Sequence, residues 1–154
     1  MKLIEILEPE AVKSTGSLSS KKRLFQSLGE LAETVYDLDA EHVTAALQDR
    51  ESLGPTSVGR GVALPHARIE GLDRVVGAFI RLSSPLDFDA IDRQPVDVIF
   101  ALFAPKEAGV EHLKALALVS RHMRNADMLA KLRANTEESA LHALLTAVEG
   151  ERAA

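Results

Sequence analysis

The chain of 154 residues contains five histidines and no cysteine, so imidazole groups are its most versatile reactive side chains. The lack of cysteine excludes disulfides, zinc–thiolate sites and thiol catalysis. His42 and His142 lie in the first turns of predicted helices, where a histidine is typically a surface or packing residue. His112 and His122 are ten residues apart, which places them about 80° apart around a helix rather than on the shared face that a metal pair needs. We therefore expect no metal site.

His66 differs from the other histidines in its setting, because it directly follows the apolar run Gly-Val-Ala-Leu-Pro. This pattern predicts a short strand over 62–64, with His66 in a loop that Pro65 stiffens. We expect Leu64 and Pro65 to stay exposed beside His66 as an apolar docking surface for another protein. Neutral imidazole is a good nucleophile toward phosphorus, so phosphoryl transfer is a chemistry that this setting allows, although the local setting alone does not favour it. A histidine that merely ends a strand is the alternative.

Motifs of nucleotide-dependent and hydrolytic enzymes are absent from the sequence. Gly59-Arg60-Gly61 leads to Pro65 rather than opening a helix, and no GxxxxGK[ST] phosphate loop occurs. An ATP-dependent kinase would need such a cradle or an equivalent metal site. A GxSxG nucleophile elbow is also missing. The chain is thus expected to work without a nucleotide or another cofactor.

The periodicity of apolar residues predicts the elements that must position His66. A short helix is expected over Leu3–Leu7, ending before Pro9. Longer helices are expected after caps at Ser19 or Ser20, Asp39 and Thr136, and from Val110 to Asn125, with a further turn or two around Met128–Leu132. The runs Val75–Leu82 and Val96–Ala104 are typical of strands buried on both faces. Helical segments on both sides of such strands predict a three-layer α/β domain.

Length and charge limit the remaining possibilities. The chain is long enough for one domain, 1–154, with a core over about 3–148 and a frayed tail over 149–154. Twenty-three acidic against 18 basic residues give a net charge of −5, which argues against nucleic-acid binding. No apolar run approaches the roughly 20 residues that span a membrane, and the acidic N-terminal segment is unlike a signal peptide. We expect a cytoplasmic protein without membrane insertion.

Four segments resemble a known family in order and spacing. They are QDRE (48–51), GRGVALPHAR (59–68), FDAIDRQPVDVIFALFAP (88–105) and GVEHLKALALVSRHM (109–123). Together they resemble the enzyme IIA proteins of the fructose/mannitol type, which belong to the bacterial phosphoenolpyruvate-dependent phosphotransferase system. The resemblance extends from about Leu3 to Val148. It implies a mixed β-sheet with helices on both faces, the fold of mannitol-type enzyme IIA.

The resemblance also implies roles for three residues. His66 matches the phosphorylated histidine, His112 matches a second active-site histidine, and Arg50 matches an arginine that helps to hold the phosphoryl group. The implied donor is a phosphorylated HPr-type or NPr-type carrier protein, and no metal or nucleotide takes part. We expect Nε2 of His66 to be the acceptor, with the other ring nitrogen held by a backbone carbonyl or a similar partner.

Three further residues, Ala67, Arg60 and Arg68, are close to His66 in the sequence. Ala67 stands where many members of the family have glycine, which would allow backbone conformations that alanine disfavours. Arg60 and Arg68 flank the histidine, and each is either a phosphate contact or a solvated surface arginine.

Two functions share this chemistry. The stretch DAIDRQPVDVIFAL resembles the nitrogen-regulatory branch, whose members signal by binding other proteins according to their phosphorylation state. The alternative is a sugar-transport enzyme IIA that passes phosphate to a IIB domain. A binding module whose histidine is never phosphorylated is a third possibility, which the intact Arg50, His66 and His112 argue against.

Overall fold

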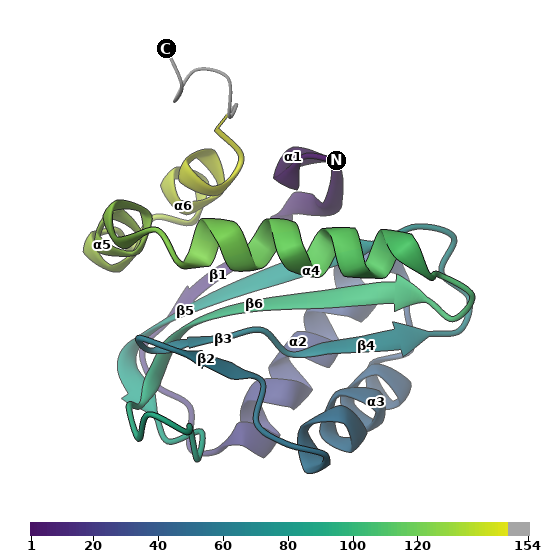
Figure 1. The fold of residues 1–154 in the computed structure, drawn as a ribbon, viewed down its shortest axis with the longest axis horizontal. Helices are drawn as coiled ribbons and strands as arrows, with labels where there is room; N and C mark the ends of the chain where they lie inside the picture. The colour runs from purple at the N-terminus through teal and green to yellow at the C-terminus, as the bar shows by residue number, and fades with distance from the viewer. Residues whose placement is uncertain (148–154) are drawn as a thin grey trace.

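The computed structural model describes residues 1–147, which fold into a six-stranded mixed sheet with helices on both faces (Figure 1). The strands are β1 (Leu7–Thr15), β2 (Ser57–Gly59), β3 (Val62–Ala63), β4 (His66–Ile69), β5 (Val76–Leu86) and β6 (Val96–Pro105). The helices are α1 (Leu3–Ile6), α2 (Lys21–Tyr36), α3 (Ala40–Ser52), α4 (Val110–Met123), α5 (Ala126–Ala134) and α6 (Glu138–Leu145). This arrangement confirms the predicted three-layer α/β fold.

The sheet is built around β6, whose residues are almost all buried. Its strand order is β1-β5-β6-β3-β2, and β4 pairs with β6 as well. β5 and β6 are antiparallel, whereas β3 and β4 both run parallel to β6, one after the other along it. Leu64 and Pro65 separate these two short strands, because proline lacks the N–H that a continuous ladder would need. The carbonyl of Pro65 still accepts from the backbone N–H of Leu102, at 2.9 Å.

Helices cover both faces of the sheet, as expected for strands without a polar side. Figure 1 shows α4 in front of the sheet, α2 behind it, and α3 beside β4, where it contacts both α2 and β4. Gly29 allows α2 and α3 to pack closely, since a Cβ at this position would lie only 2.6 Å from the carbonyl oxygen of Ala40. The predicted caps Ser20 and Asp39 are confirmed, because their side chains accept from the backbone N–H groups of Arg23 and His42.

The first strand is the main element that the sequence did not predict. The expected helix over Leu3–Leu7 is confirmed as α1, but the chain then continues directly as β1. Pro9 is tolerated there because β1 is an edge strand, where a missing N–H removes no ladder bond. The outer edge of β1 is covered by α6, whose Glu138 accepts from the backbone N–H of Ser14 at 3.1 Å.

The C-terminal helices differ slightly from the prediction. Asn125 does not simply end a helix but caps α5, accepting from the N–H of Met128 at 3.0 Å. Glu137 rather than Thr136 is the residue before α6. The expected helical position of Val148 and the expected frayed tail lie outside the described residues. Within 1–147, no helix combines the length and apolar character needed to cross a bilayer.

Candidate active site

His66 is the first residue of β4 and is half-buried. The prediction placed it in a loop beyond a strand; instead, its backbone is part of the sheet, opposite Leu102 of β6. Its Nδ1 lies 2.8 Å from the carbonyl oxygen of Leu64. A carbonyl can only accept, so Nδ1 carries the proton and Nε2 presents its lone pair. The expectation of a backbone carbonyl on one ring nitrogen is thus confirmed.

His112 lies in the first turn of α4, and its ring packs against that of His66. The ring centroids are 5.6 Å apart and the planes are inclined by 71°. The His112 residue is only 6% exposed, and among residues 1–147 its buried Nε2 has no hydrogen-bond partner. A buried polar atom without a partner is costly, which is typical of a site that a further group completes.

Burial and neighbouring cations favour the neutral forms of both histidines. Desolvation by burial lowers the pKa of His66, and the charge of Arg50 lowers it further. Burial also lowers the pKa of His112, together with the charges of His66 and Arg68. Both side chains are therefore mainly neutral near pH 7, and His66 has a free lone pair for attack.

Arg50 reaches this site from the last turn of α3, a helix that packs against β4. Its Nη1 donates to the carbonyl oxygen of Gly54, at 3.1 Å. The side chain is half-buried, and its charge acts on His66. The structure thus brings together Arg50, His66 and His112, the three residues that the resemblance singled out.

The predicted docking surface of Leu64 and Pro65 is wrong. Leu64 is only 5% exposed, and Pro65 is also buried. The reason is their position between β3 and β4, where both residues lie alongside the central strand β6 and the side chain of Leu64 joins the core.

Other large apolar side chains, close in sequence to Arg50 and His112, are exposed instead. Leu53, which follows α3 three residues after Arg50, is 83% exposed. Val110 and Leu113 are 63% and 66% exposed, and they stand on either side of His112 in the α4 sequence. Sequence periodicity misses such residues, since it shows an apolar side chain but not whether a neighbour covers it.

The structure separates the two flanking arginines. The guanidinium of Arg60 donates to the carbonyl oxygen of Arg124, just after the C-terminal end of α4, at 3.3 Å. His112 lies at the other end of this 14-residue helix, about 20 Å away. Arg68 shares a face of β4 with His66, two residues along the strand, and donates to the carbonyl oxygen of Ala108 just before α4. Arg68 is thus at the same end of α4 as His112, whereas Arg60 is at the opposite end.

Ala67 causes no backbone strain at the site. It is buried in β4, paired with Phe103 of β6. Among the described residues, the non-glycine positions with positive φ are Asp37, Arg60, Asp89 and Arg93, and Ala67 is not among them. The extended backbone at this position accepts alanine as well as glycine.

The other histidines make contacts away from His66. Nδ1 of His122 lies 3.0 Å from the carbonyl oxygen of Leu118, and Nε2 of His142 lies 2.9 Å from that of Leu7. His42 is exposed on α3. Within residues 1–147, no group of three or more histidine, aspartate or glutamate side chains is arranged to hold a metal ion.

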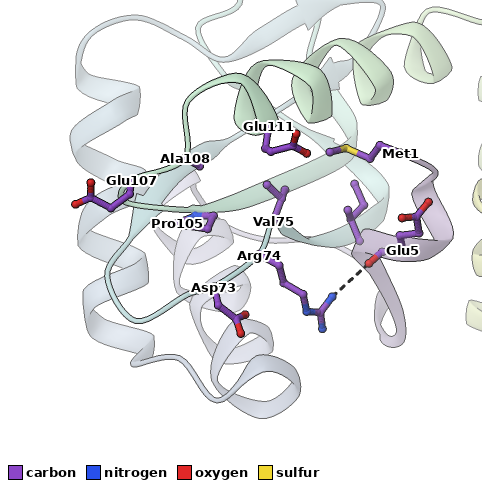
Figure 2. Close-up of a pocket in the computed structure, with 10 residues that line it drawn as sticks. Met1, Glu5, Asp73, Arg74, Val75, Pro105, Glu107, Ala108 and Glu111 are labelled. Atoms are coloured by element: carbon purple, nitrogen blue, oxygen red, sulfur yellow. Dashed lines mark hydrogen bonds between the residues drawn. The ribbon is translucent and has the colours of Figure 1, made fainter.

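A pocket of about 520 Å³ lies between the N-terminal segment and the start of α4 (Figure 2). Its lining comprises Met1, Glu5, Ile6, Asp73, Arg74, Val75, Pro105, Glu107, Ala108 and Glu111. Four acidic residues and one arginine, Arg74, line it, and the guanidinium of Arg74 donates to the carbonyl oxygen of Glu5 at 3.3 Å. A phosphoryl group would be repelled there by like charge. None of Arg50, His66 and His112 lines this pocket, so the candidate active site lies outside it.

Known proteins resemble this chain over almost its whole length. The sequence model of the family described as "Phosphoenolpyruvate-dependent sugar phosphotransferase system, EIIA 2" matches residues 5–148. A nitrogen regulatory protein of Bradyrhizobium diazoefficiens is 40% identical over 145 residues, covering 94% of this chain and 95% of the relative.

Two solved structures are similar in fold. The nitrogen regulatory protein IIA-Ntr from Neisseria meningitidis has a TM-score of 0.86 and 37% identity, covering 92% of this chain and 97% of that one. The IIA mannitol protein of Escherichia coli has a TM-score of 0.75 at 18% identity, covering 90% of this chain and 97% of that one, and it supports the fold alone. With the family match and these relatives, the chain belongs to the type 2 enzyme IIA family of the phosphoenolpyruvate-dependent phosphotransferase system, which makes it a phosphotransfer protein.

Proposed function

We propose that this protein is a phosphocarrier that accepts a phosphoryl group on Nε2 of His66 from an HPr-type or NPr-type carrier and acts as a regulatory enzyme IIA. The observation that carries the proposal is the hydrogen bond of His66 Nδ1 to the Leu64 carbonyl, beside His112. This bond fixes the tautomer whose Nε2 is nucleophilic. Burial keeps the ring neutral by lowering its pKa.

The transfer itself needs little beyond positioning and charge compensation. The Nε2 lone pair attacks phosphorus, and the bond between phosphorus and the donor atom breaks in line, its electron pair remaining with the donor. Negative charge on the equatorial oxygens then faces Arg50 and Nε2 of His112, which has no hydrogen-bond partner among residues 1–147. In the neutral tautomer that carries its proton on Nε2, His112 would donate a hydrogen bond from Nε2. In the doubly protonated form, it would donate the same bond and add a positive charge. These two side chains supply the compensation that the reaction requires.

The exposed apolar residues Leu53, Val110 and Leu113 supply a docking surface for the carrier. Exposed apolar side chains that gather at one place, here called the apolar rim, mark sites of protein–protein interaction. Since these side chains come from the ends of α3 and α4, which also carry Arg50 and His112, docking places the donor directly over the site.

The regulatory output follows from the change of charge at this surface. Phosphorylation adds close to two negative charges beside the rim, which a bound partner must pair or desolvate. A partner without suitable cations binds the unphosphorylated form better, and a ten- to hundredfold preference corresponds to roughly 1.4 to 2.8 kcal/mol. The names of the curated relatives, nitrogen regulatory proteins, support this branch.

The phosphoryl site is tested by incubating the protein with phosphoenolpyruvate, enzyme I and an HPr-type carrier, then mapping acid-labile phosphate by mass spectrometry. We expect one phosphoryl group on His66 and none in His66→Ala. His42→Ala, which removes an exposed histidine of α3, is the matched control and should be labelled normally. Label on His112, or label that survives in His66→Ala, would contradict the assignment. A protein that accepts no phosphate would be a binding module.

The output is tested by pull-down from native cell extract with the wild type, His66→Ala and a phosphorylated sample. Regulatory proteins whose yields differ between the two phosphorylation states would support the proposal. A sugar permease or IIB protein recovered as the main, phosphate-dependent partner would instead establish the transport function.

A further inference from the structure

Glu51, the neighbour of Arg50 at the end of α3, has a buried carboxylate with a complete set of partners. Its side chain is only 7% exposed. Oε1 accepts from the hydroxyl of Thr56 at 2.6 Å, and the backbone N–H of Thr56 donates to both oxygens at 3.1 and 3.2 Å. Nζ of Lys21 donates to Oε2 at 2.9 Å. A charge is rarely buried without such pairing, so this carboxylate has a defined place in the fold.

The partners of Glu51 belong to several elements that meet beside the site. Thr56 directly precedes β2, and Lys21 is the first residue of α2. The ammonium group of Lys21 also lies 4.6 Å from the centre of the Phe88 ring. The carboxylate therefore ties the end of α3 to the start of β2 and to the start of α2.

Arg50 and Glu51 hold the same turn between α3 and β2. Arg50 donates to the carbonyl oxygen of Gly54, while Glu51 binds Thr56 two residues further on. If the Thr56 contact is lost, the turn is free to move, and Gly54 with it. Arg50 would then lose the acceptor that orients its guanidinium. The orientation of the Arg50 guanidinium thus depends on the Glu51 carboxylate, which itself binds Thr56 and Lys21.

We propose that Glu51 is a positioning residue for phosphoryl transfer, which acts through Arg50 by clamping the 53–56 turn against the end of α3. This inference rests on the proposed function, and it assigns to Glu51 no contact with the phosphoryl group. The opposite effects of the two residues on His66 agree with it. Arg50 lowers the pKa of His66, whereas Glu51 raises it, so both charges lie within electrostatic reach of the ring.

Thr56→Val tests the clamp without changing any charge. It removes the hydroxyl that donates to Glu51 but keeps the branched shape of the side chain, and Thr56→Ser restores the hydroxyl. If the clamp orients Arg50, release of Arg50 should raise the pKa of His66 in Thr56→Val, because a nearby cation is lost. The shift is measured by NMR titration of the imidazole. Arg50→Gln sets its upper limit, and Thr56→Ser should titrate like the wild type.

The rate of phosphoryl transfer gives the second readout. We expect Thr56→Val and Glu51→Gln to slow transfer at least tenfold, since small misplacements of a catalytic group have such effects. In an Arg50→Gln background, the same changes should slow transfer no further, because residues that act through one another are not additive. Glu138→Gln is the matched control, for Glu138 also accepts from a backbone N–H but lies on α6, and it should leave the rate and the titration unchanged.

The experiments test the phosphocarrier function and the positioning role of Glu51 separately, because the NMR titration of His66 needs no phosphoryl donor. A wild type that accepts no phosphate would refute the proposed function, while the titration would still test the clamp. An unshifted His66 titration in folded Thr56→Val, combined with unchanged transfer rates in Thr56→Val and Glu51→Gln, would overturn the positioning role. So would fully additive losses of rate in the Arg50→Gln background, which would show that Glu51 acts independently of Arg50.

Discussion

Replacing His112 by alanine separates its role in catalysis from its role in packing. The ring lies 5.6 Å from that of His66, centroid to centroid, and its Nε2 has no hydrogen-bond partner among residues 1–147. Loss of one charge-stabilising donor typically slows transfer by about a hundredfold, which corresponds to about 2.7 kcal/mol in activation free energy.

The effect of His112→Ala on stability should be smaller. Within residues 1–147 no hydrogen bond to Nε2 is lost, so the free energy of unfolding should fall by about 1 to 2 kcal/mol, mainly from the cavity that the ring leaves. His112→Gln, which keeps an N–H donor near the same place, should recover part of the rate.

Single-turnover transfer from the phosphorylated carrier, followed by rapid quenching, measures the rate. Thermal and urea unfolding measure the stability. A variant that transfers at the wild-type rate would refute the assignment of His112 as a stabilising residue. A variant whose slow transfer is matched by extensive unfolding would show that the ring is needed for packing instead.

Four further changes have defined outcomes. Arg50→Ala should keep the fold and slow transfer on the order of a hundredfold in the same assay. At pH 6.5 the transfer rate should stay above half of its value at high pH, because the pKa of His66 lies below its ordinary value of 6.5; halving at pH 6.5 would contradict this. For the same reason, titration of His66 and His112 should lower the free energy of unfolding as the pH falls below about 6.5, where the unfolded chain binds more protons; His66→Gln should weaken this dependence. Leu113→Glu should weaken carrier binding without affecting unfolding, whereas Leu64→Ala should destabilise the buried core by about 2 to 5 kcal/mol; the reverse pattern would restore Leu64 as a docking residue.

Much of the fold could be predicted from local sequence patterns. The uninterrupted apolar run at 96–104 corresponds to β6, and the caps Ser20 and Asp39 stand where α2 and α3 begin. These features depend on neighbours within a few residues, through side-chain periodicity and hydrogen bonds to nearby N–H groups. The Pro65–His66 motif and the family resemblance likewise pointed to His66 without any knowledge of distant contacts.

Tertiary structure decided which of these residues meet and which are covered. β1 exists because Leu7–Thr15 pairs with β5 and is covered by α6, a long-range environment that its own sequence does not show. Leu64 and Pro65 are buried because they lie alongside β6 in the sheet, whereas Leu53, just after α3, is exposed.

The site depends on the same long-range packing. His66 and His112 come from separate elements, and only the packing of α4 on the sheet brings their rings together. Arg60 and Arg68 are nearly equivalent in the sequence around His66, yet they bind opposite ends of α4. Local composition sets the chemistry that each side chain can perform, but burial, pKa and partners depend on atoms that are distant in the sequence, and these are fixed only when the sheet and its helices assemble.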